Sequence, residues 1–568
     1  MKRILTLLTA IIYIGNTITG QNLLAIPDTL SGTNFNLNIY DTTKVFYTGY
    51  NTNTFGINAK YLGPTLFLNK GDSISVNFNN HLMDTTTIHW HGMHVSAMND
   101  GGPHIIIPPS TTWNPKFKVR DNAAMYWYHP HLHMMTNLHA SLGAAGLVIV
   151  RDTIESALNL PRRYGVDDFP LVIQSKCFDA SKQIVIDSVM MVNGTIKPYL
   201  PTPAQVIRFR LLNASSERVY NLGFQGNLTF YQIGTDGGLL NAPVSLTRLR
   251  LAPGERADIL IDFTGKIGQA INLMSFASEL PNAIYGALQP GMGAGQVIPG
   301  YTLNVLNGTN FNIMTFNIVA QTVSPITTIP PTLITNTPWP IGSAGAFKTL
   351  TFAPVTMGPT AIQGPFLINS TSFNMNVVNY SIPLNNVEIW TLNNQSPIAH
   401  PFHIHDIQFY ITEINGVAPP ANMAGRKDVV LVPAGQTVKF IAKFETFCDS
   451  MATYMYHCHM LPHEDDGMMG QFVVACPAGV GIEEYDSKSN ELIVYPNPSS
   501  NKITIKHNSN EIITEVSLFD YSGKLILTKR DLNLNEVALD LNLQTSGIYF
   551  LEIKMTQGII YKKINLNK

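Results

Sequence analysis

The sequence predicts an all-β protein with several sandwich domains in series. Segments that alternate apolar and polar residues, as half-buried strands do, recur at 71–79, 206–213 and 387–393. Only 13% of the residues are charged, against about 25% in typical soluble proteins, so Asn, Thr and Ser must supply much of the polar surface. A chain of 568 residues is long enough for several domains. These features favour a β-rich exported protein.

Residues 1–20 have the pattern of a secretory signal. Lys2 and Arg3 give a basic start, Ile4–Gly15 forms an apolar core, and cleavage is expected after Gly20. The core is too short to cross a membrane as a helix, and the chain has no other apolar run of that length. We therefore expect export without stable membrane insertion. The alternative is a buried N-terminal helix.

Three successive segments carry the strand pattern, and each is long enough for one sandwich. The expected domains are residues 21–158, 165–325 and 341–477. Two of them share a repeat: the sequence Tyr126–His131 of the first domain is similar to Tyr454–His459 of the third. The middle segment has no histidine. Residues 322–340 are rich in Pro and Thr and are expected to connect the middle and last domains.

Histidines separated by one residue recur along the chain. Sixteen histidines in 568 residues would give about 0.5 such pairs by chance, and five occur. The pairs are His89/His91, His129/His131, His131/His133, His403/His405 and His457/His459. This excess indicates a function that uses several imidazoles together.

The segment Tyr454–Met469 combines one of these pairs with a cysteine. In an extended strand, His457 and His459 point to one face and Cys458 points to the other. A thiolate with nearby imidazoles and a weak thioether suits a blue-copper electron-transfer site, and two imidazoles on the reverse face suit a second copper centre. The alternative is a strand with two structural histidines and a buried cysteine.

Four segments, taken in order, resemble the copper-binding motifs of the multicopper oxidases, the laccase-like family. The segments are Ile88–Gly92, Tyr126–His131, His400–His405 and Tyr456–His459. The resemblance covers residues 45–476, and the four motifs together are highly specific. It implies three cupredoxin-like Greek-key β-sandwiches. The first and third keep copper motifs, and the middle one is expected to set how the other two meet.

The resemblance also implies the copper ligands. The ligands of the mononuclear blue (type 1) copper are His400, Cys458 and His463. The long axial ligand is Met468, in preference to Met469. Those of the type 2 copper are His89 and His403. Those of the type 3 pair are His91, His129, His131, His405, His457 and His459. The first and third domains each supply half of the trinuclear ligands. We therefore expect four coppers per chain and a trinuclear cluster at the interface of these domains.

The resemblance implies an oxidase that couples four one-electron oxidations of a reducing substrate to the reduction of dioxygen to two waters. Electrons are expected to pass from the blue copper through Cys458 to His457 and His459. Asp100 and Glu464 occupy positions similar to those of the family's acidic proton donors near the cluster. The alternative for both carboxylates is a surface or helix-capping role.

Three functional classes fit these residues. An oxidase of phenols, aromatic amines or bilirubin-like compounds is favoured, and a metallo-oxidase of Cu(I) or Mn(II) is the alternative. Some cuprous oxidases of the family carry a long Met-rich insertion before the third motif, whereas residues 353–401 contain only Met357 and Met375. The third class, a non-catalytic copper protein, would not need eight trinuclear ligands.

Further histidines and cysteines lie near the motifs. We expect the extra histidines to lie beside ligands or at the surface rather than to bind metal; they are His94, His104, His133 and His139. Three cysteines remain besides Cys458, and an odd number leaves at least one free or intermolecular thiol. They are Cys177, Cys448 and Cys476. The last two flank the final motif and are candidates for a pair.

The composition changes after Cys476. Residues 478–488 are expected to form a linker, and residues 489–568 a small β-sandwich. Three short segments resemble the C-terminal sorting domain of type IX secretion substrates: Tyr495–Pro498, Ser522–Lys524 and Ser546–Tyr549. This implies contact with the type IX machinery and passage through the periplasm to a secreted or surface location. The alternative is an unrelated sandwich or carbohydrate-binding module.

The net charge of the whole chain is −2, which implies no bulk attraction to nucleic acid. We also expect a monomer.

Overall fold

The computed structural model describes residues 21–291, 301, 304–356, 364–476, 492–507, 512–520, 524–556 and 558–568. The chain divides into two compact units, Met1–Cys476 and Pro477–Lys568, and each is described by itself. The predicted signal (residues 1–20) and linker (residues 478–488) lie outside the described residues. The all-β prediction is confirmed, because the described residues form many strands and only four short α-helices. None of these helices is long and apolar enough to cross a membrane.

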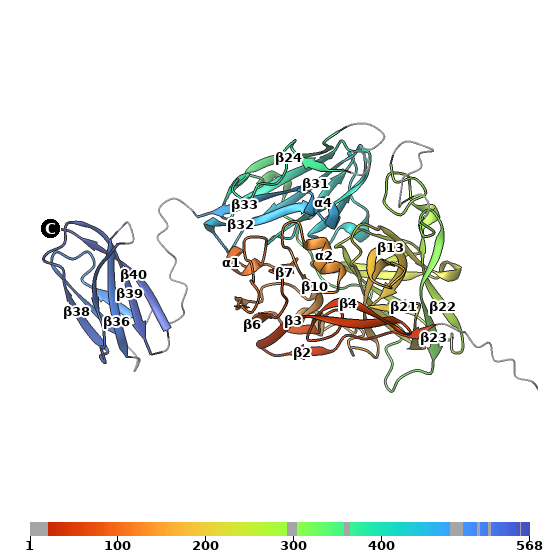
Figure 1. Ribbon diagram of the computed structural model, residues 1–568, viewed down its shortest axis with the longest axis horizontal. Coiled ribbons are helices and arrows are strands. Elements are labelled where there is room, and N and C mark those ends of the chain that lie inside the picture. The colour runs from red at the N-terminus through yellow and green to blue at the C-terminus, as the bar shows by residue number, and fades with distance from the viewer. Residues whose placement is uncertain are drawn as a thin grey trace, which may run out of the picture. The chain divides into compact units, whose positions relative to one another are not determined.

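The first sandwich packs two sheets around one core (Figure 1). One sheet has the order β2-β5-β11-β10-β7, with bounds Thr29–Ser31, Thr65–Asn69, Gly146–Arg151, Ala124–His129 and His89–His91. The other has the order β4-β3-β6-β8 with β9 beside β6, with bounds Tyr50–Ile57, Asn34–Tyr47, Ser73–Asn80, Thr112–Trp113 and Lys116–Lys118. Alternate residues of β6 are buried, so its predicted apolar face fills the core.

The middle sandwich has larger sheets. The first, β14-β13-β12-β16-β21-β18-β19, comprises Thr195–Ile196, Ile184–Val192, Asp168–Phe178, Val206–Asn213, Arg256–Asp262, Phe230–Thr235 and Gly238–Leu246. The second, β1-β15-β23-β22-β17-β20, comprises Asn22–Leu23, Pro198–Pro203, Asn310–Val319, Ala270–Phe276, Tyr220–Phe224 and Leu249–Leu251. Strand β1 pairs in parallel with β15, so the first residues after the predicted signal join the middle sandwich rather than the first.

The third sandwich again packs two five-stranded sheets around an apolar core. The order β25-β24-β27-β31-β29 comprises Phe366–Ile368, Ala346–Pro354, Val387–Asn394, Thr437–Lys443 and Tyr410–Ile414. The order β26-β33-β32-β28-β30 comprises Tyr380–Pro383, Met469–Ala475, Asp449–Cys458, His400–Ile404 and Val429–Val432. The four short helices are α1 (Ala97–Asp100), α2 (Thr136–Ser141), α3 (Thr153–Ser156) and α4 (Leu461–Asp465).

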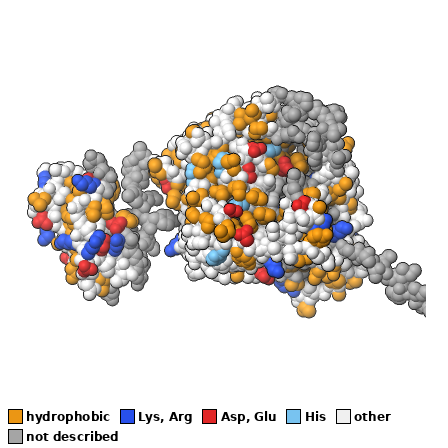
Figure 2. Space-filling model, viewed as in Figure 1, with side chains coloured by type: hydrophobic (Ala, Val, Ile, Leu, Met, Phe, Trp, Pro, Cys, Tyr) orange, Lys and Arg blue, Asp and Glu red, His pale blue; other side chains and the backbone are white. Residues whose placement is uncertain are grey.

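The C-terminal unit is a separate small sandwich. Its sheets have the orders β34-β35-β38 (Leu492–Tyr495, Lys502–His507, Glu536–Asp540) and β37-β36-β39-β40 (Leu525–Lys529, Ile513–Asp520, Gly547–Met555, Gly558–Leu566). It has its own buried core, which includes Ile503, Leu518 and Leu551. Figure 2 shows charged side chains scattered among apolar and uncharged polar ones on the visible face of the first unit, in line with the low charged content.

Strand register brings the histidine motifs together within each outer sandwich. In the first, β7 pairs with β10 so that His89 lies opposite His129. In the third, β28 pairs with β32 so that His403 lies opposite His457. Motifs that are far apart in the sequence therefore become neighbours on adjacent strands, at one end of each sandwich.

Candidate metal centre

Eight histidines from the first and third sandwiches meet in what we call the histidine cluster. Its members are His89, His91, His129, His131, His403, His405, His457 and His459, and none is more than 1% exposed. Contacts cross between the sandwiches: His131 Nε2 lies 3.1 Å from both His457 Nε2 and His405 Nε2. His459 Nε2 lies 3.3 Å from His91 Nδ1. The eight histidines therefore lie at the interface of the first and third sandwiches, where we expect them from the motifs.

The cluster divides into groups whose ligand atoms lie within 4.8 Å of one another. The groups that contain only histidines are His89/His403/His405, His91/His129/His459 and His131/His405/His457. His405 belongs to two of these groups, so neighbouring groups overlap. Such spacing is that of ligands around metal ions.

Several ring nitrogens that face away from the cluster, the outer nitrogens, lie beside oxygen atoms of the protein. Four lie beside main-chain carbonyls at 2.8 to 3.0 Å: His89 Nδ1 at Asp100, His129 Nδ1 at Pro130, His403 Nδ1 at Asp428 and His457 Nδ1 at Cys458. An outer nitrogen that donates its proton to an oxygen leaves the inner nitrogen with a lone pair. The orientation of these rings is thereby fixed.

The inner nitrogens are consistent with metal binding. The Nε2 atoms of His89 and His403 are buried without a hydrogen-bond partner. Burial is the main cause that lowers the pKa of His91, His131 and His405 well below the ordinary range, and neighbouring imidazoles lower it further. Neutral rings that face one another with lone pairs repel unless a cation lies between them. The donor set therefore fits several metal ions.

Two carboxylates predicted as proton donors lie against the cluster. Asp100, at the end of α1, places Oδ2 at 2.7 Å from His405 Nδ1. Glu464, in α4, places Oε1 at 3.3 Å from His131 Nδ1 and Oε2 at 3.2 Å from His457 Nδ1. Both side chains are 1% exposed, and burial raises the pKa of Glu464 well above its ordinary range. Neither is a surface carboxylate, which was the alternative.

A third carboxylate, Asp428, was missed by the sequence analysis. Its Oδ1 lies 3.1 Å from His91 Nε2, and it is fully buried. The only available signal was its place directly before the apolar strand β30, which pairs with the motif strand β28. A buried aspartate at the start of a core strand needs a partner. The sequence offered no way to identify that partner.

The second centre, which we call the cysteine group, comprises His400, Cys458 and His463. The Cys458 Sγ lies 3.5 Å from His400 Nδ1 and 3.6 Å from His463 Nδ1. Burial raises the pKa of the Cys458 thiol and lowers the pKa of His463 to about 3. Ser396 Oγ, 2.7 Å from His400 Nε2, orients that ring. Soft sulfur and two imidazoles are the donors that a blue-copper site uses.

Met468 lies beside the cysteine group. It is fully buried in the apolar core that also contains Cys458 and Met460, and its carbonyl accepts a hydrogen bond of 3.0 Å from the Cys458 amide. The predicted axial ligand is thus hydrogen-bonded to Cys458 through the main chain and shares its apolar core. The two centres also share strand β32: Cys458 packs into the third sandwich, whereas His457 and His459 join the histidine cluster.

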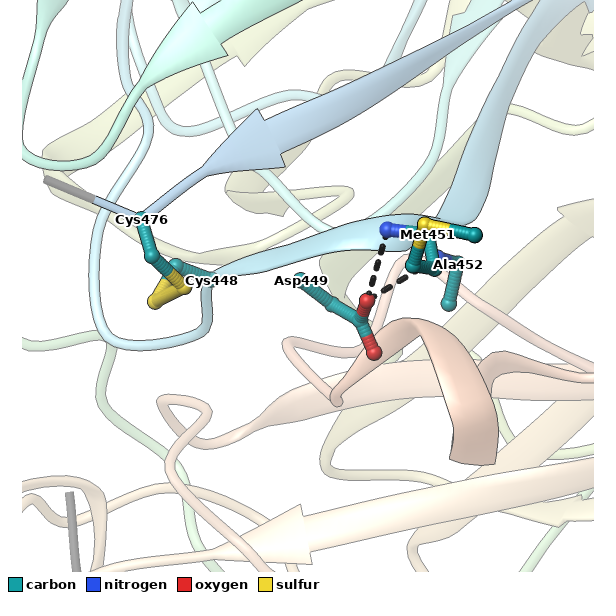
Figure 3. The surroundings of a disulfide bond; sticks show 5 residues. All are labelled: Cys448, Asp449, Met451, Ala452 and Cys476. Carbon is teal, nitrogen blue, oxygen red and sulfur yellow. Dashed lines mark hydrogen bonds between the residues drawn. A yellow bond between two sulfur atoms is a disulfide. The ribbon is translucent and has the colours of Figure 1, made fainter. Parts of the chain in front are cut away.

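The extra histidines bind other groups. His94 lies 2.8 Å from Asp406, His104 lies 2.7 Å from Gln471 and His139 lies 3.1 Å from Thr86, while His133 contacts the Phe373 ring. Cys448 and Cys476 form a disulfide (Figure 3), and Cys177 is a free thiol. The disulfide lies between the start of β32 and the end of β33, at the boundary of the first unit.

Comparisons with known proteins agree with this geometry. Sequence profiles of the multicopper oxidases match residues 39–155 and 348–477, and that of a secretion system C-terminal sorting domain matches residues 493–567. A multicopper oxidase of Staphylococcus haemolyticus is 31% identical over 481 residues, which cover 81% of this chain and 94% of the relative.

Solved structures give the same result. McoA multicopper oxidase from Aquifex aeolicus is 30% identical, with a TM-score of 0.70, over 80% of this chain and 100% of the other. A laccase-like multicopper oxidase, CueO, from Ochrobactrum sp. is 28% identical, with the same TM-score of 0.70 and the same coverage. The resemblance stated from the motifs is confirmed. The chain belongs to the multicopper oxidases, oxidoreductases that use copper and dioxygen, and it ends in a secretion sorting domain.

Proposed function

We propose that the protein is a secreted laccase-like oxidase that couples four one-electron oxidations of a phenol, an aromatic amine or a bilirubin-like compound to the reduction of dioxygen to two waters. The observation that carries the proposal is the shared strand β32. The strand contains His457 and ends at Cys458, and His459 follows directly; Cys458 belongs to one centre, and the adjacent His457 and His459 belong to the other. This continuity provides a covalent path for electrons between a one-electron site and a site with several metals.

The proposed copper assignment gives four ions per chain. The type 1 ligands are His400, Cys458, His463 and Met468; the type 2 ligands are His89 and His403; the type 3 ligands are His91, His129 and His459 at one ion and His131, His405 and His457 at the other. Bound copper supplies one-electron redox chemistry at the cysteine group and dioxygen reduction at the histidine cluster, and it enforces the thiolate form of Cys458. The grouping of the donor atoms supports this division.

The protein's own residues handle protons and solvent. Glu464 is buried between His131 and His457, and burial raises its pKa, which favours the protonated form. Asp100 holds His405 through Oδ2, while its buried Oδ1 has no hydrogen-bond partner. Both are therefore placed to deliver protons beside the cluster. His463 is 6% exposed, whereas His400 is 0% exposed, which favours electron uptake at His463.

The favoured substrate class draws support from a relative. The Ochrobactrum protein is described as having oxidase activity towards lignin model compounds and lignosulfonate, which are phenolic or phenol-derived. The sorting domain supports release from the cell or attachment at its surface through the type IX machinery, where such substrates are accessible.

An oxidase of Cu(I) or Mn(II) is the second candidate, and a cavity between the first and third sandwiches favours Cu(I) as its substrate. The cavity measures about 390 Å³, and its lining includes three thioethers and an imidazole: Met98, Met375, Met451 and His104. Thioethers suit Cu(I). The sequence argument from a missing Met-rich insertion therefore does not exclude this activity.

Oxygen uptake by the copper-loaded protein decides between these candidates. A phenol, bilirubin, Cu(I) and Mn(II) are supplied in parallel at equal reducing capacity, with copper-free protein as the control. We expect the fastest uptake with the phenol. Uptake with Cu(I) alone would establish the metallo-oxidase, and no uptake with any of the four would contradict an oxidase function.

A further inference from the structure

The middle sandwich supplies no histidine, yet two of its residues lie near the histidine cluster: Gly254 just before β21, and Arg256 at the start of β21. A side chain on Gly254, which has a φ of +82°, would lie 2.9 Å from the His459 ring, so the backbone of the middle sandwich lies directly against that histidine. Two residues later, the guanidinium of Arg256 is buried, with 2% of the side chain exposed. A buried arginine this close to a metal site requires partners.

Those partners belong to all three sandwiches. Arg256 forms two parallel hydrogen bonds of 2.5 Å with the carboxylate of Asp428 in the third sandwich. Its Nε donates to the carbonyl of Met125 in β10 of the first sandwich, at 3.3 Å. Within the middle sandwich it donates to the carbonyls of Gly254 and Asp236, at 3.1 and 3.0 Å. Arg256 therefore links the three sandwiches at one point.

Asp428 transmits this contact to two histidines of the cluster. Its Oδ1 lies 3.1 Å from His91 Nε2, and its main-chain carbonyl lies 2.9 Å from His403 Nδ1. His91 differs from the other cluster histidines because its Nδ1, rather than its Nε2, faces the cluster, at 3.3 Å from His129 and from His459. The reversed ring needs an acceptor at Nε2, and Asp428 provides it.

The surroundings hold the pair in one position. Asp236 accepts a hydrogen bond of 2.8 Å from the Arg256 amide and lies 3.3 Å from the Asp428 amide. Lys427 lies 2.9 Å from Asp236, which anchors this acid in turn. Gly92, at the end of the first histidine motif, leaves room for the pair, because a side chain there would meet Asp428 Oδ2 at 2.4 Å. This close contact is the physical reason why glycine fits at the end of that motif.

We propose that Arg256 is a positioning residue for the histidine cluster: through Asp428 it fixes the reversed ring of His91 and the ring of His403. The middle sandwich thereby sets the geometry of the type 2 copper and of the neighbouring type 3 copper. This inference rests on the copper assignment under Proposed function. It gives the histidine-free sandwich a direct part in the site, beyond spacing its neighbours.

Arg256→Met tests the inference in the copper-loaded full chain, and Arg208→Met is its matched control. Arg208 is also fully buried in the middle sandwich and is also held by carboxylates, those of Asp258 and Glu155. The readouts are copper per chain, copper affinity in competition with a chelator, the type 2 spin-resonance signal, the blue absorption band and the thermal midpoint.

We expect Arg256→Met to lower the affinity for the most weakly held copper about 10- to 100-fold and to alter the type 2 signal. The blue band should keep its intensity, because the cysteine group has no contact with Arg256 among the described interactions. Arg208→Met should lower the thermal midpoint without a change in the spectra. Arg256→Lys keeps the charge but not the two parallel hydrogen bonds, so it should resemble Arg256→Met.

An unchanged type 2 signal and copper affinity in Arg256→Met would overturn the inference. Equal spectral changes in Arg256→Met and Arg208→Met would also overturn it, because they would indicate general loosening. A wild-type protein without a type 2 signal would instead refute the copper assignment. If Arg256→Met does not fold, Arg256→Lys and Gly92→Ala give the same measurements, since Gly92→Ala displaces the pair without removing a charge.

Discussion

The cysteine group and the histidine cluster share one strand but depend on different amounts of the fold. His400, Cys458 and His463 all belong to the third sandwich. The histidine cluster takes its ligands from the first and third sandwiches, and Arg256 of the middle sandwich lies behind it. The first centre therefore lies within one domain, whereas the second takes its histidines from two domains and a supporting arginine from a third. Variants that separate the two centres test this difference.

Cys458→Ser should have the largest effect, because this side chain belongs to one centre and its neighbours belong to the other. A serine hydroxyl cannot replace a thiolate as a soft copper ligand. The blue charge-transfer band and the oxidase activity should disappear together. Absorption spectra and oxygen uptake of the copper-loaded variant check this. A variant that remains blue would show that Cys458 is not the thiolate ligand.

A pair of ligand variants should separate the centres. His463→Ala should impair the blue site and leave the type 3 pair formed, because His463 belongs only to the cysteine group. His129→Ala should do the reverse and leave a blue protein that accepts electrons but reduces dioxygen poorly. Copper counts with optical and spin-resonance spectra measure both. Loss of every copper in both variants would show that the centres are not independent.

Asp100→Asn and Glu464→Gln keep the shape of the carboxyl groups but remove their protons, so they sharpen the comparison. Both acids contact the histidine cluster and not the cysteine group. Dioxygen reduction should slow by about 10²-fold while reduction of the blue copper keeps its rate. Single-turnover spectroscopy separates the two steps. Equal turnover in variant and wild type would show that the carboxyls are structural.

The pH profile gives a second readout for Glu464. Burial raises its pKa well above the ordinary range, so the proton donor is present at pH values below that pKa and is lost as pH rises through it. Dioxygen reduction in the wild type should therefore fall on the alkaline side. In Glu464→Gln this fall should flatten. A profile with the same alkaline fall in both proteins would assign it to another group.

Removal of the C-terminal unit should have the smallest effect on chemistry. The unit has its own core, and all ligands lie before Cys476. A chain that ends near Ser487 should bind copper and oxidise substrate like the full chain, but in its native host it should remain in the periplasm. Specific activity and cell fractionation measure this. Loss of activity at full copper loading would show that the C-terminal unit takes part in catalysis. Normal release of the truncated protein from the cell would show that this unit does not direct export.

The sequence was informative where ligands share a strand. His457, Cys458 and His459 follow the two-residue period of a strand, so their division between two faces could be predicted from spacing alone. The alternation in β6 likewise predicted its buried face. The grouping of six of the histidines into two sets of three also required the packing of the first sandwich against the third, because each set takes residues from both.

Contacts between sandwiches could not be predicted. Arg256 and Asp428 are separated by 172 residues and lie in different domains, so no local period relates them. The same holds for β1, whose two residues pair in the middle sandwich because an edge strand was available there. Asp100 and Glu464 were found only because their positions resembled those of a family. Buried charges at domain junctions carry no sequence pattern of their own.

The disulfide between Cys448 and Cys476 has a mechanical consequence. It joins two residues that are 28 positions apart in the sequence, and the enclosed segment contains Cys458, His463 and Met468. The chain leaves the first unit at Cys476. Tension applied to the chain after Cys476 would therefore reach a covalent crosslink before it reached strand β33. The load passes through sulfur to the beginning of β32, and the segment that carries the copper ligands stays free of tension.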